Sequence, residues 1–181
     1  MLVTMTGQLT VCDAAPGDAA AIAEIYAHYV LESTATFETD PPDAAESERR
    51  MRELIKGGYP FLVTRDDDGR VLAFGFAQRY GPRAGYLYSV ETTIYVCQGS
   101  LNRGIGSALL QALLGECEKR GFRQAFAVIA ASEPASVVLH ARAGFLPVGT
   151  LTAAGWKHGQ WIDVFLMQRR LGDGNETLPA S

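Results

Sequence analysis

The sequence predicts a single domain of the mixed α/β class, in which about four helices flank a mostly antiparallel sheet of about seven strands. Three observations support this class. The chain has 181 residues, which fits one domain of roughly 150 residues with little to spare. Its composition, 48% hydrophobic and 20% charged, is that of a soluble globular protein and excludes disordered and fibrous classes. Segments with strand and helix periodicity alternate, in an order that predicts a parallel pair at the centre of the sheet.

The first half of the chain predicts one strand, two helices and a hairpin. Pro16 can begin the first helix, in which apolar residues recur at helical spacing from Ile22 to Val30. Gly57 ends the second helix, and the Asp-Gly step at Gly69 favours a tight hairpin. The expected elements are a strand near Gln8–Cys12, a helix from Pro16, a loop over Ser33–Pro42, a helix over Asp43–Lys56, and strands over Phe61–Thr64 and Val71–Gln78.

The second half predicts the centre of the sheet and its closing strands. The expected elements are a strand over Tyr86–Val96, a helix over Gly104–Arg120, a strand over Phe122–Ile129, a helix over Pro134–Arg142, and strands over Leu146–Ala153 and Trp161–Gln168. We interpret the segment from Trp156 to Trp161 as a hairpin in which Trp161 is a core aromatic residue. The domain is expected to span residues 1–171, followed by a polar, disordered tail over residues 172–181.

Charge and composition exclude several classes of partner and site. Sixteen Lys and Arg against twenty Asp and Glu give a net charge of −4, which offers no general attraction for nucleic acid or an anionic membrane. The longest apolar run is far shorter than the ~20 residues of a membrane helix. Residues 1–10 lack the features of a secretory signal, so we expect a cytoplasmic protein. Three dispersed cysteines indicate reduced thiols, and the histidine spacing predicts no catalytic metal.

The turn before the central helix is a candidate anion site. It joins the long strand to the best helix of the chain, so free backbone N–H groups and the helix dipole point at one place. Gly104 and Gly106 leave room for a ligand, and Arg103 adds a positive charge. The turn matches neither a P-loop nor the dinucleotide fingerprint. Glycines that merely permit a tight turn are the alternative interpretation.

Glu91 is the candidate general base. On the predicted strand it alternates with Leu87, Ser89, Thr93 and Tyr95, which places them on one face. A carboxylate on an otherwise apolar or hydroxylic central strand is costly unless it has a role. The alternative is a strand carboxylate that pairs with an arginine.

Several motifs in order carry a resemblance to a known family. The sequence resembles the GNAT acetyltransferase superfamily and, more narrowly, the phosphinothricin and methionine sulfoximine N-acetyltransferases. The similarity covers roughly Val11 to Gln168 and rests on the segments Ser33–Phe37, Val90–Val96, Arg103–Gly106, His140–Phe145 and Gly155–Val164.

The resemblance implies a GNAT-like fold and acetyl-CoA as the co-substrate. In this family the Gly-rich turn binds the pyrophosphate and the preceding strand holds the pantetheine arm. The implied acetyl-CoA residues are Tyr95, Val96, Leu101, Asn102, Arg103, Gly104, Ile105, Gly106, Ser107, Glu133 and Ser136. Leu101 and Glu133 depart from the family, which usually has Gln or Arg and often Asn there; we expect weaker CoA binding and the loss of one side-chain contact.

The resemblance also implies the reaction and its residues. The acceptor would be the α-amine of a small amino acid or analogue, attacking directly in a ternary complex. Glu91 would take the ammonium proton, and His140 would either assist thiol release or line the pocket as a hydrogen-bonding residue. Phe37, Arg83, Tyr86 and Thr93 would line the acceptor pocket, although Phe37 could simply anchor its loop and Arg83 could be a solvated charge. Lys157 and His158 are further candidates near the acceptor site.

Other functions stay open at this point. The acceptor could instead be a protein N-terminus, a polyamine or an aminoglycoside, or the domain could be a non-catalytic acyl-CoA sensor. A covalent acetyl-cysteine route is less attractive, because Cys97 and Cys117 have no histidine nearby in sequence. Family resemblance alone implies a homodimer.

Overall fold

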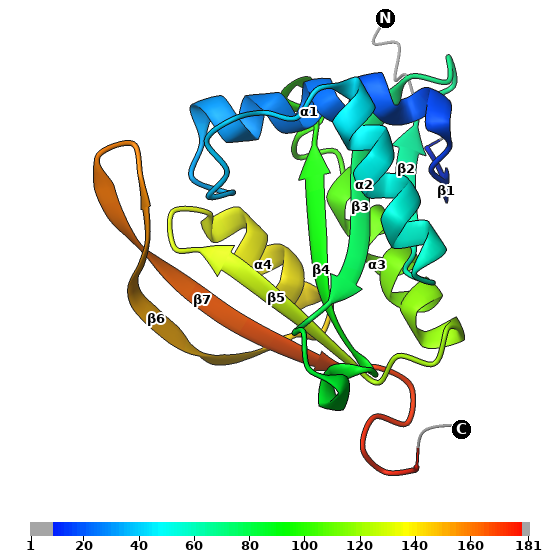
Figure 1. The fold of residues 1–181 in the computed structure, drawn as a ribbon, viewed down its shortest axis with the longest axis vertical. Coiled ribbons are helices and arrows are strands. Elements are labelled where there is room, and N and C mark those ends of the chain that lie inside the picture. Colours follow the sequence, from blue (N-terminus) through cyan, green and yellow to red (C-terminus); the bar gives the residue numbers. More distant parts are fainter. Residues whose placement is uncertain (1–8, 179–181) are drawn as a thin grey trace, which may run out of the picture.

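A computed structural model of the protein describes residues 9–178 and confirms the predicted class. Seven strands form one sheet in the order β1-β2-β3-β4-β5-β7-β6 (Figure 1). The strands are β1 (Thr10–Asp13), β2 (Phe61–Arg65), β3 (Val71–Arg79), β4 (Ser89–Val96), β5 (Gln124–Ala130), β6 (Leu146–Lys157) and β7 (Gln160–Arg170). The helices are α1 (Ala19–Glu32), α2 (Ala44–Lys56), α3 (Ile105–Lys119) and α4 (Pro134–Arg142), with 3-10 turns η1 (Pro16–Asp18), η2 (Ala84–Tyr86) and η3 (Gln98–Ser100).

Helices cover both faces of the sheet because neighbouring strand residues point to opposite sides. Phe61 and Val63 of β2 pack in a cluster with residues of α1 and α2. Leu62, between them, packs in a different cluster with Ile105 and Leu109 of α3. α1 and α2 therefore lie over one face and α3 over the other. Within residues 9–178, every helix is too short or too polar to cross a membrane.

The centre of the sheet opens between β4 and β5. These two strands run parallel, whereas the other neighbouring pairs of the described sheet are antiparallel. Their pairing ends at Glu91 opposite Phe126, although both strands continue beyond it. Figure 1 shows β4 and β5 diverging from that point. The opening leaves unpaired backbone and a cleft in the middle of the domain.

The largest differences from the predicted strand boundaries are at the start of β4 and at the end of β6. Tyr86 and Leu87 lie outside the central strand, since β4 begins only at Ser89 and Tyr86 belongs to η2. The cause is local: the Tyr86 ring packs against Gly81, where a Cβ would come within 2.8 Å, so the chain turns back on itself before the strand. β6 and β7 are longer than predicted, because a register shift between Leu151 and Gly155 lets β6 continue past its expected end.

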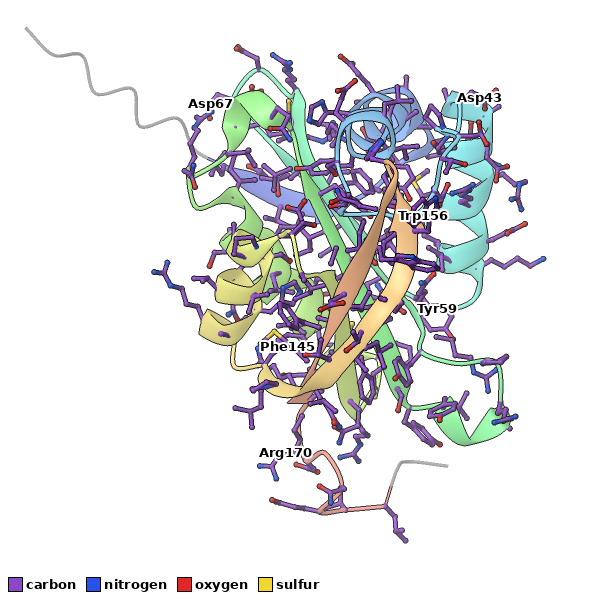
Figure 2. All side chains as sticks on the ribbon, turned by 90° about the vertical axis from the view of Figure 1, so that its left-hand side faces the viewer. Asp43, Tyr59, Asp67, Phe145, Trp156 and Arg170 are labelled. Carbon is purple, nitrogen blue, oxygen red and sulfur yellow. The ribbon has the colours of Figure 1, made fainter. Side chains whose placement is uncertain are left out.

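The two tryptophans of the last hairpin are surface residues. Trp156 is 55% exposed and Trp161 is 65% exposed, so the expectation of a core Trp161 is wrong. The two rings contact each other edge to face, with centroids 5.1 Å apart, on a hairpin that extends beyond the helical layers. Figure 1 shows this β6–β7 hairpin at the side of the sheet, and Figure 2 shows it facing the viewer, with Trp156 toward its upper end.

At the chain ends, the described structure stops short of the predicted elements. Gln8, expected in the first strand, and residues 179–181 of the expected tail lie outside the described residues. Residues 172–178 form turns after the buried Leu171, and Arg123 contacts both Asp173 and the carbonyl of Leu178. The disordered character of residues 172–181 stays a prediction.

Candidate active site

A cleft of about 810 Å³ lies where β4 and β5 diverge. It is bounded by the end of β4, the turn before α3, the β5–α4 connection and the loop that follows α1. Its lining includes most of the residues predicted for the site: Phe37, Glu91, Thr93, Tyr95, Val96, Leu101, Asn102, Gly104, Ile105, Gly106, Ser107, Glu133, Ser136 and His140. One cleft therefore brings together residues from four separate segments.

The turn before α3 presents backbone amides to this cleft. Asn102 and Gly104 have φ angles of 59° and 78°, in the left-handed region, and Gly104 is the N-cap residue just before α3. The N–H of Ala108 donates the first hydrogen bond of α3, to the carbonyl of Gly104 at 3.0 Å. The amides of residues 105–107 precede that bond and point out of the helix end. This arrangement suits a phosphate or pyrophosphate group.

Glu91 is held at the branch point of the sheet in a partly buried position. It pairs with Gln78 across β3 and β4, and the Gln78 side chain forms a hydrogen bond with it. Burial raises the pKa of Glu91 above its usual range, while the hydrogen bond from Gln78 opposes that rise. Its partner in the described structure is thus an amide and not an arginine. A carboxylate with a raised pKa is suited to act as a general base near neutral pH.

His140 lies on α4 with only 4% of its surface exposed. Its Nδ1 is 2.8 Å from the carbonyl oxygen of Ser136, an atom that can only accept, so Nδ1 carries the proton in the neutral ring. Nε2 is then the acceptor, and among the described residues it has no partner. Burial lowers the pKa of His140, although the Ser136 carbonyl opposes that change. The ring is therefore neutral at physiological pH, with its lone pair on Nε2.

The loop of residues 33–42, which follows α1, forms one wall of the cleft and is held from two sides. On the helix side, the Tyr26 hydroxyl bonds to the Thr36 hydroxyl at 2.8 Å. On the hairpin side, Nζ of Lys157 donates to the carbonyl of Thr36 at 2.8 Å. The Phe37 ring rests on Gly155 of β6, where a Cβ would approach it to 2.2 Å. The position of Phe37 thus depends on a hairpin more than 100 residues further along the chain.

A second cavity, of about 500 Å³, adjoins the cleft on the side of α1 and α2. Thr36, Glu91, Thr93 and Tyr95 line both cavities. Its remaining walls are mainly aromatic side chains from β2 and β3 and polar side chains from α2. Glu91 therefore lies between two spaces, one bordered by the α3 turn and one bordered by aromatic rings.

Three predicted site residues lie outside both cavities. Arg103 is in the turn, but its exposed side chain does not line the cleft. Arg83 and Tyr86 belong to the exposed connection between β3 and β4, where Tyr86 packs edge to face on Tyr80 with centroids 5.4 Å apart. In a single chain, the structure does not bring these two residues to Glu91.

Sequence reasoning missed Gln78 and the role of Lys157. Gln78 could have been found only from the register of β3 and β4, which fixes it opposite Glu91. Lys157 was a candidate by position, yet its burial depends on contact between the hairpin and the 33–42 loop. Neither signal exists in a local stretch of sequence.

Comparisons with known proteins agree with this geometry. A family model for the acetyltransferase (GNAT) domain matches residues 13–166. The chain is 40% identical to a phosphinothricin N-acetyltransferase of Alcaligenes faecalis, over 90% of this chain and 82% of that one. It is 33% identical to an L-methionine sulfoximine/L-methionine sulfone acetyltransferase of Pseudomonas aeruginosa, over 88% of this chain and 92% of that one.

A solved structure extends the similarity to three dimensions. The crystal structure of a GNAT superfamily phosphinothricin acetyltransferase from Sinorhizobium meliloti, in complex with AcCoA, superposes with a TM-score of 0.93 at 41% identity, over 98% of this chain and 95% of that chain. The family match spans most of the chain, and the fold and the cleft agree with it. The chain therefore belongs to the GNAT acetyltransferase family.

Proposed function

We propose that the protein transfers the acetyl group of acetyl-CoA to the α-amine of a small amino acid or amino-acid analogue, of the phosphinothricin or methionine sulfoximine type. The observation that carries this proposal is the position of Glu91, at the point where β4 and β5 part and the amide-lined cleft begins. Relatives that share most of this chain's length are named for these acceptors, which supports the same acceptor class here.

The proposed reaction is a direct attack. The free amine attacks the thioester carbonyl, a C–N bond forms, the C–S bond breaks, and CoA leaves as its thiol. An α-ammonium group with a pKa near ~8 is mostly protonated at neutral pH, so Glu91 first accepts one proton. The amides of residues 102–107, with Arg103 beside them, would hold the pyrophosphate, and Tyr95 and Val96 would line the pantetheine path. Free backbone N–H groups on the parted strands can stabilise the developing oxyanion.

His140 and the cysteines enter this mechanism differently. A neutral His140 can protonate the departing thiolate only after it has received a proton at Nε2, so it would act as a relay and not as a reservoir of protons. Cys117 is fully buried, and burial raises the pKa of its thiol to about 12, which makes it a poor nucleophile. These features favour direct transfer over an acetyl-cysteine intermediate.

The acceptor would occupy the space between the 33–42 loop and Glu91. Phe37 and Thr93 line the cleft there. Arg83 and Tyr86 line neither cavity of a single chain, so their expected contact with the acceptor's carboxylate stays a prediction. An arginine in that role would favour a carboxylate over a polycationic acceptor.

We also propose that the protein is a cytoplasmic homodimer whose domain ends near Leu171. Apolar side chains on the β6–β7 hairpin support the dimer: Leu146 is 71% exposed, and Val148, Leu151, Trp156 and Trp161 are exposed as well. Such a surface is typical of protein interfaces. Acetyl-CoA is a cytoplasmic metabolite, and the free thiols of Cys12, Cys97 and Cys117 suit a reducing compartment. Light scattering measures the oligomeric state directly.

The deciding experiment is mass-spectrometric detection of acetylated product from a pool of amino acids and analogues incubated with acetyl-CoA. We expect acetylation on the α-amine of one or a few acceptors, and a fall in rate of about a hundredfold or more in Glu91→Gln. Acetyl-CoA binding without any acetylated amino acid would instead favour a larger acceptor or a sensor.

A further inference from the structure

The second cavity beside Glu91 points to the kind of acceptor. We propose that this cavity receives the acceptor's side chain and that its acidic end selects amino acids whose side chains carry no negative charge. The inference rests on the proposed function and adds that the protein prefers acceptors with neutral side chains over acceptors with anionic ones.

The two cavities share lining residues where the chemistry must occur. When the acceptor's amine lies at Glu91, it faces the thioester in the cleft. The rest of the acceptor must then extend away from the thioester. The space that adjoins Glu91 away from the α3 turn is the second cavity, because Glu91, Thr93 and Tyr95 line both. Its volume of about 500 Å³ exceeds what an amino-acid side chain requires.

The walls of the cavity suit an uncharged stem. Phe61 stacks on Phe74 with centroids 6.0 Å apart and on Phe76 with centroids 5.2 Å apart, and all three rings line the cavity. Tyr95 and Tyr26 add aromatic surface on the neighbouring side. Methylene groups and a sulfur atom pack well against such rings.

The end of the cavity that is formed by α2 and the 33–42 loop is acidic. Arg50 is the one cationic side chain in its described lining, and Glu38 and Glu53 lie in the same lining. Nη1 of Arg50 donates to both carboxylate oxygens of Glu38, at 2.9 and 3.0 Å, and Nε donates to Glu46 at 2.8 Å. The guanidinium charge is therefore already compensated from within the protein. Arg49, outside the lining, pairs with both Glu46 and Glu53. Three carboxylates are thus matched by two guanidinium groups, so a phosphinate or carboxylate entering here would meet surplus negative charge, whereas a sulfone or sulfoximine would not.

The direct test compares two acceptors of similar length, methionine sulfone with a neutral end and phosphinothricin with an anionic one. We expect the wild-type protein to have a kcat/KM for methionine sulfone about tenfold or more above that for phosphinothricin. Glu38→Gln removes a negative charge and leaves Arg50 paired with Glu46 alone, so the ratio should fall about fivefold. Glu48→Gln is the matched control: Glu48 lies on the same helix and pairs with Arg52, but it lines neither cavity, so the ratio should stay unchanged.

A second pair of variants tests whether the side chain enters the cavity at all. Ser47 is 5% exposed and lines the cavity from α2. Ser47→Leu fills part of the space and should lower kcat/KM for methionine sulfone about tenfold, with less effect on alanine, whose methyl group is short. Arg52→Leu is the control, because Arg52 lies on the same helix, is exposed and lines neither cavity, so it should have little effect on either acceptor. Acetyl-CoA affinity measured on each variant confirms that it is folded.

The outcomes distinguish failure of the inference about the second cavity from failure of the proposed function. A wild-type preference for phosphinothricin, or a ratio that does not respond to Glu38→Gln, overturns the inference and leaves the amino-acid acetyltransferase proposal standing. Equal effects of Ser47→Leu on methionine sulfone and alanine also overturn it. Failure to acetylate any amino acid overturns the proposed function and this inference together.

Discussion

At the N-terminus of α3 the cleft is lined by backbone amides from consecutive residues, whereas at the 33–42 loop it is lined by side chains held from two other segments, α1 and β6. The amide side depends on a glycine with a left-handed φ and on one helix end, both close together in sequence. The loop side depends on Tyr26, on Lys157 and on Gly155. A ligand common to a whole family can be bound by the first kind of wall, while selection of an acceptor can vary through the second.

Breaking the amide side should have the largest effect. Gly104→Val places a branched side chain at a φ of 78° and in the path of the pyrophosphate. Acetyl-CoA affinity measured by titration calorimetry should fall more than about a hundredfold, and adding Arg103→Ala should abolish measurable binding. Gly115→Val, in the interior of α3 where an added Cβ meets no atom within 4 Å, should bind normally. Unchanged titration heats in the Gly104 variant would remove the turn from the binding site.

The proton relay should come next in size. His140→Gln keeps a polar side chain on α4 but cannot pass a proton from the amine to sulfur, so kcat should fall about tenfold with little change in acetyl-CoA affinity. Pre-steady-state measurement of CoA release would locate the loss in the chemical step. A change below twofold would assign His140 to the wall of the cleft alone.

The same contrast explains what could be predicted from the sequence. The α3 turn and Glu91 were identifiable because glycines, a helix start and an isolated strand carboxylate are local signals. The mostly antiparallel sheet with a parallel pair at its centre followed from the alternation of elements. Trp161 was placed in the core because aromatic residues usually are, but β6 and β7 extend past the layers that would cover it. Gln78 and Lys157 became visible only when strand register and a loop contact brought them to their partners.

Loosening the loop side should have a smaller effect, confined to the acceptor. Lys157 is 4% exposed, and Nζ donates to the carbonyls of Thr36 and Tyr29. Lys157→Met keeps the apolar stem but loses both hydrogen bonds, so the loop carrying Phe37 should be held less firmly. The KM for the acceptor should rise about fivefold while acetyl-CoA affinity stays constant.

The control for this variant is Lys56→Met, an exposed lysine in the last turn of α2, which should alter neither constant. A role limited to stability would lower the melting temperature of Lys157→Met without separating the two affinities. If Lys157→Met lost affinity for acetyl-CoA and for the acceptor to the same extent, Lys157 would not have a positioning role at the acceptor site.

The smallest effect should appear in the pH dependence of the reaction. Glu91 acts as a base only when ionised, so activity falls as the pH drops through its pKa, which burial has raised. The hydrogen bond from Gln78 stabilises the ionised form and lowers that pKa, so its removal in Gln78→Leu should raise the pKa further. The acidic limb of the pH profile of kcat/KM for a fixed acceptor should then move to higher pH, with the rate at high pH nearly retained.

Gln78→Glu would add a second carboxylate opposite Glu91 and should move the acidic limb in the same direction, because like charges disfavour ionisation. If the acidic limb stays in place in both variants, the pKa that it reports belongs to a group other than Glu91. The candidate base would then be Glu133, the other carboxylate in the described lining of the cleft, whose pKa is also raised by burial.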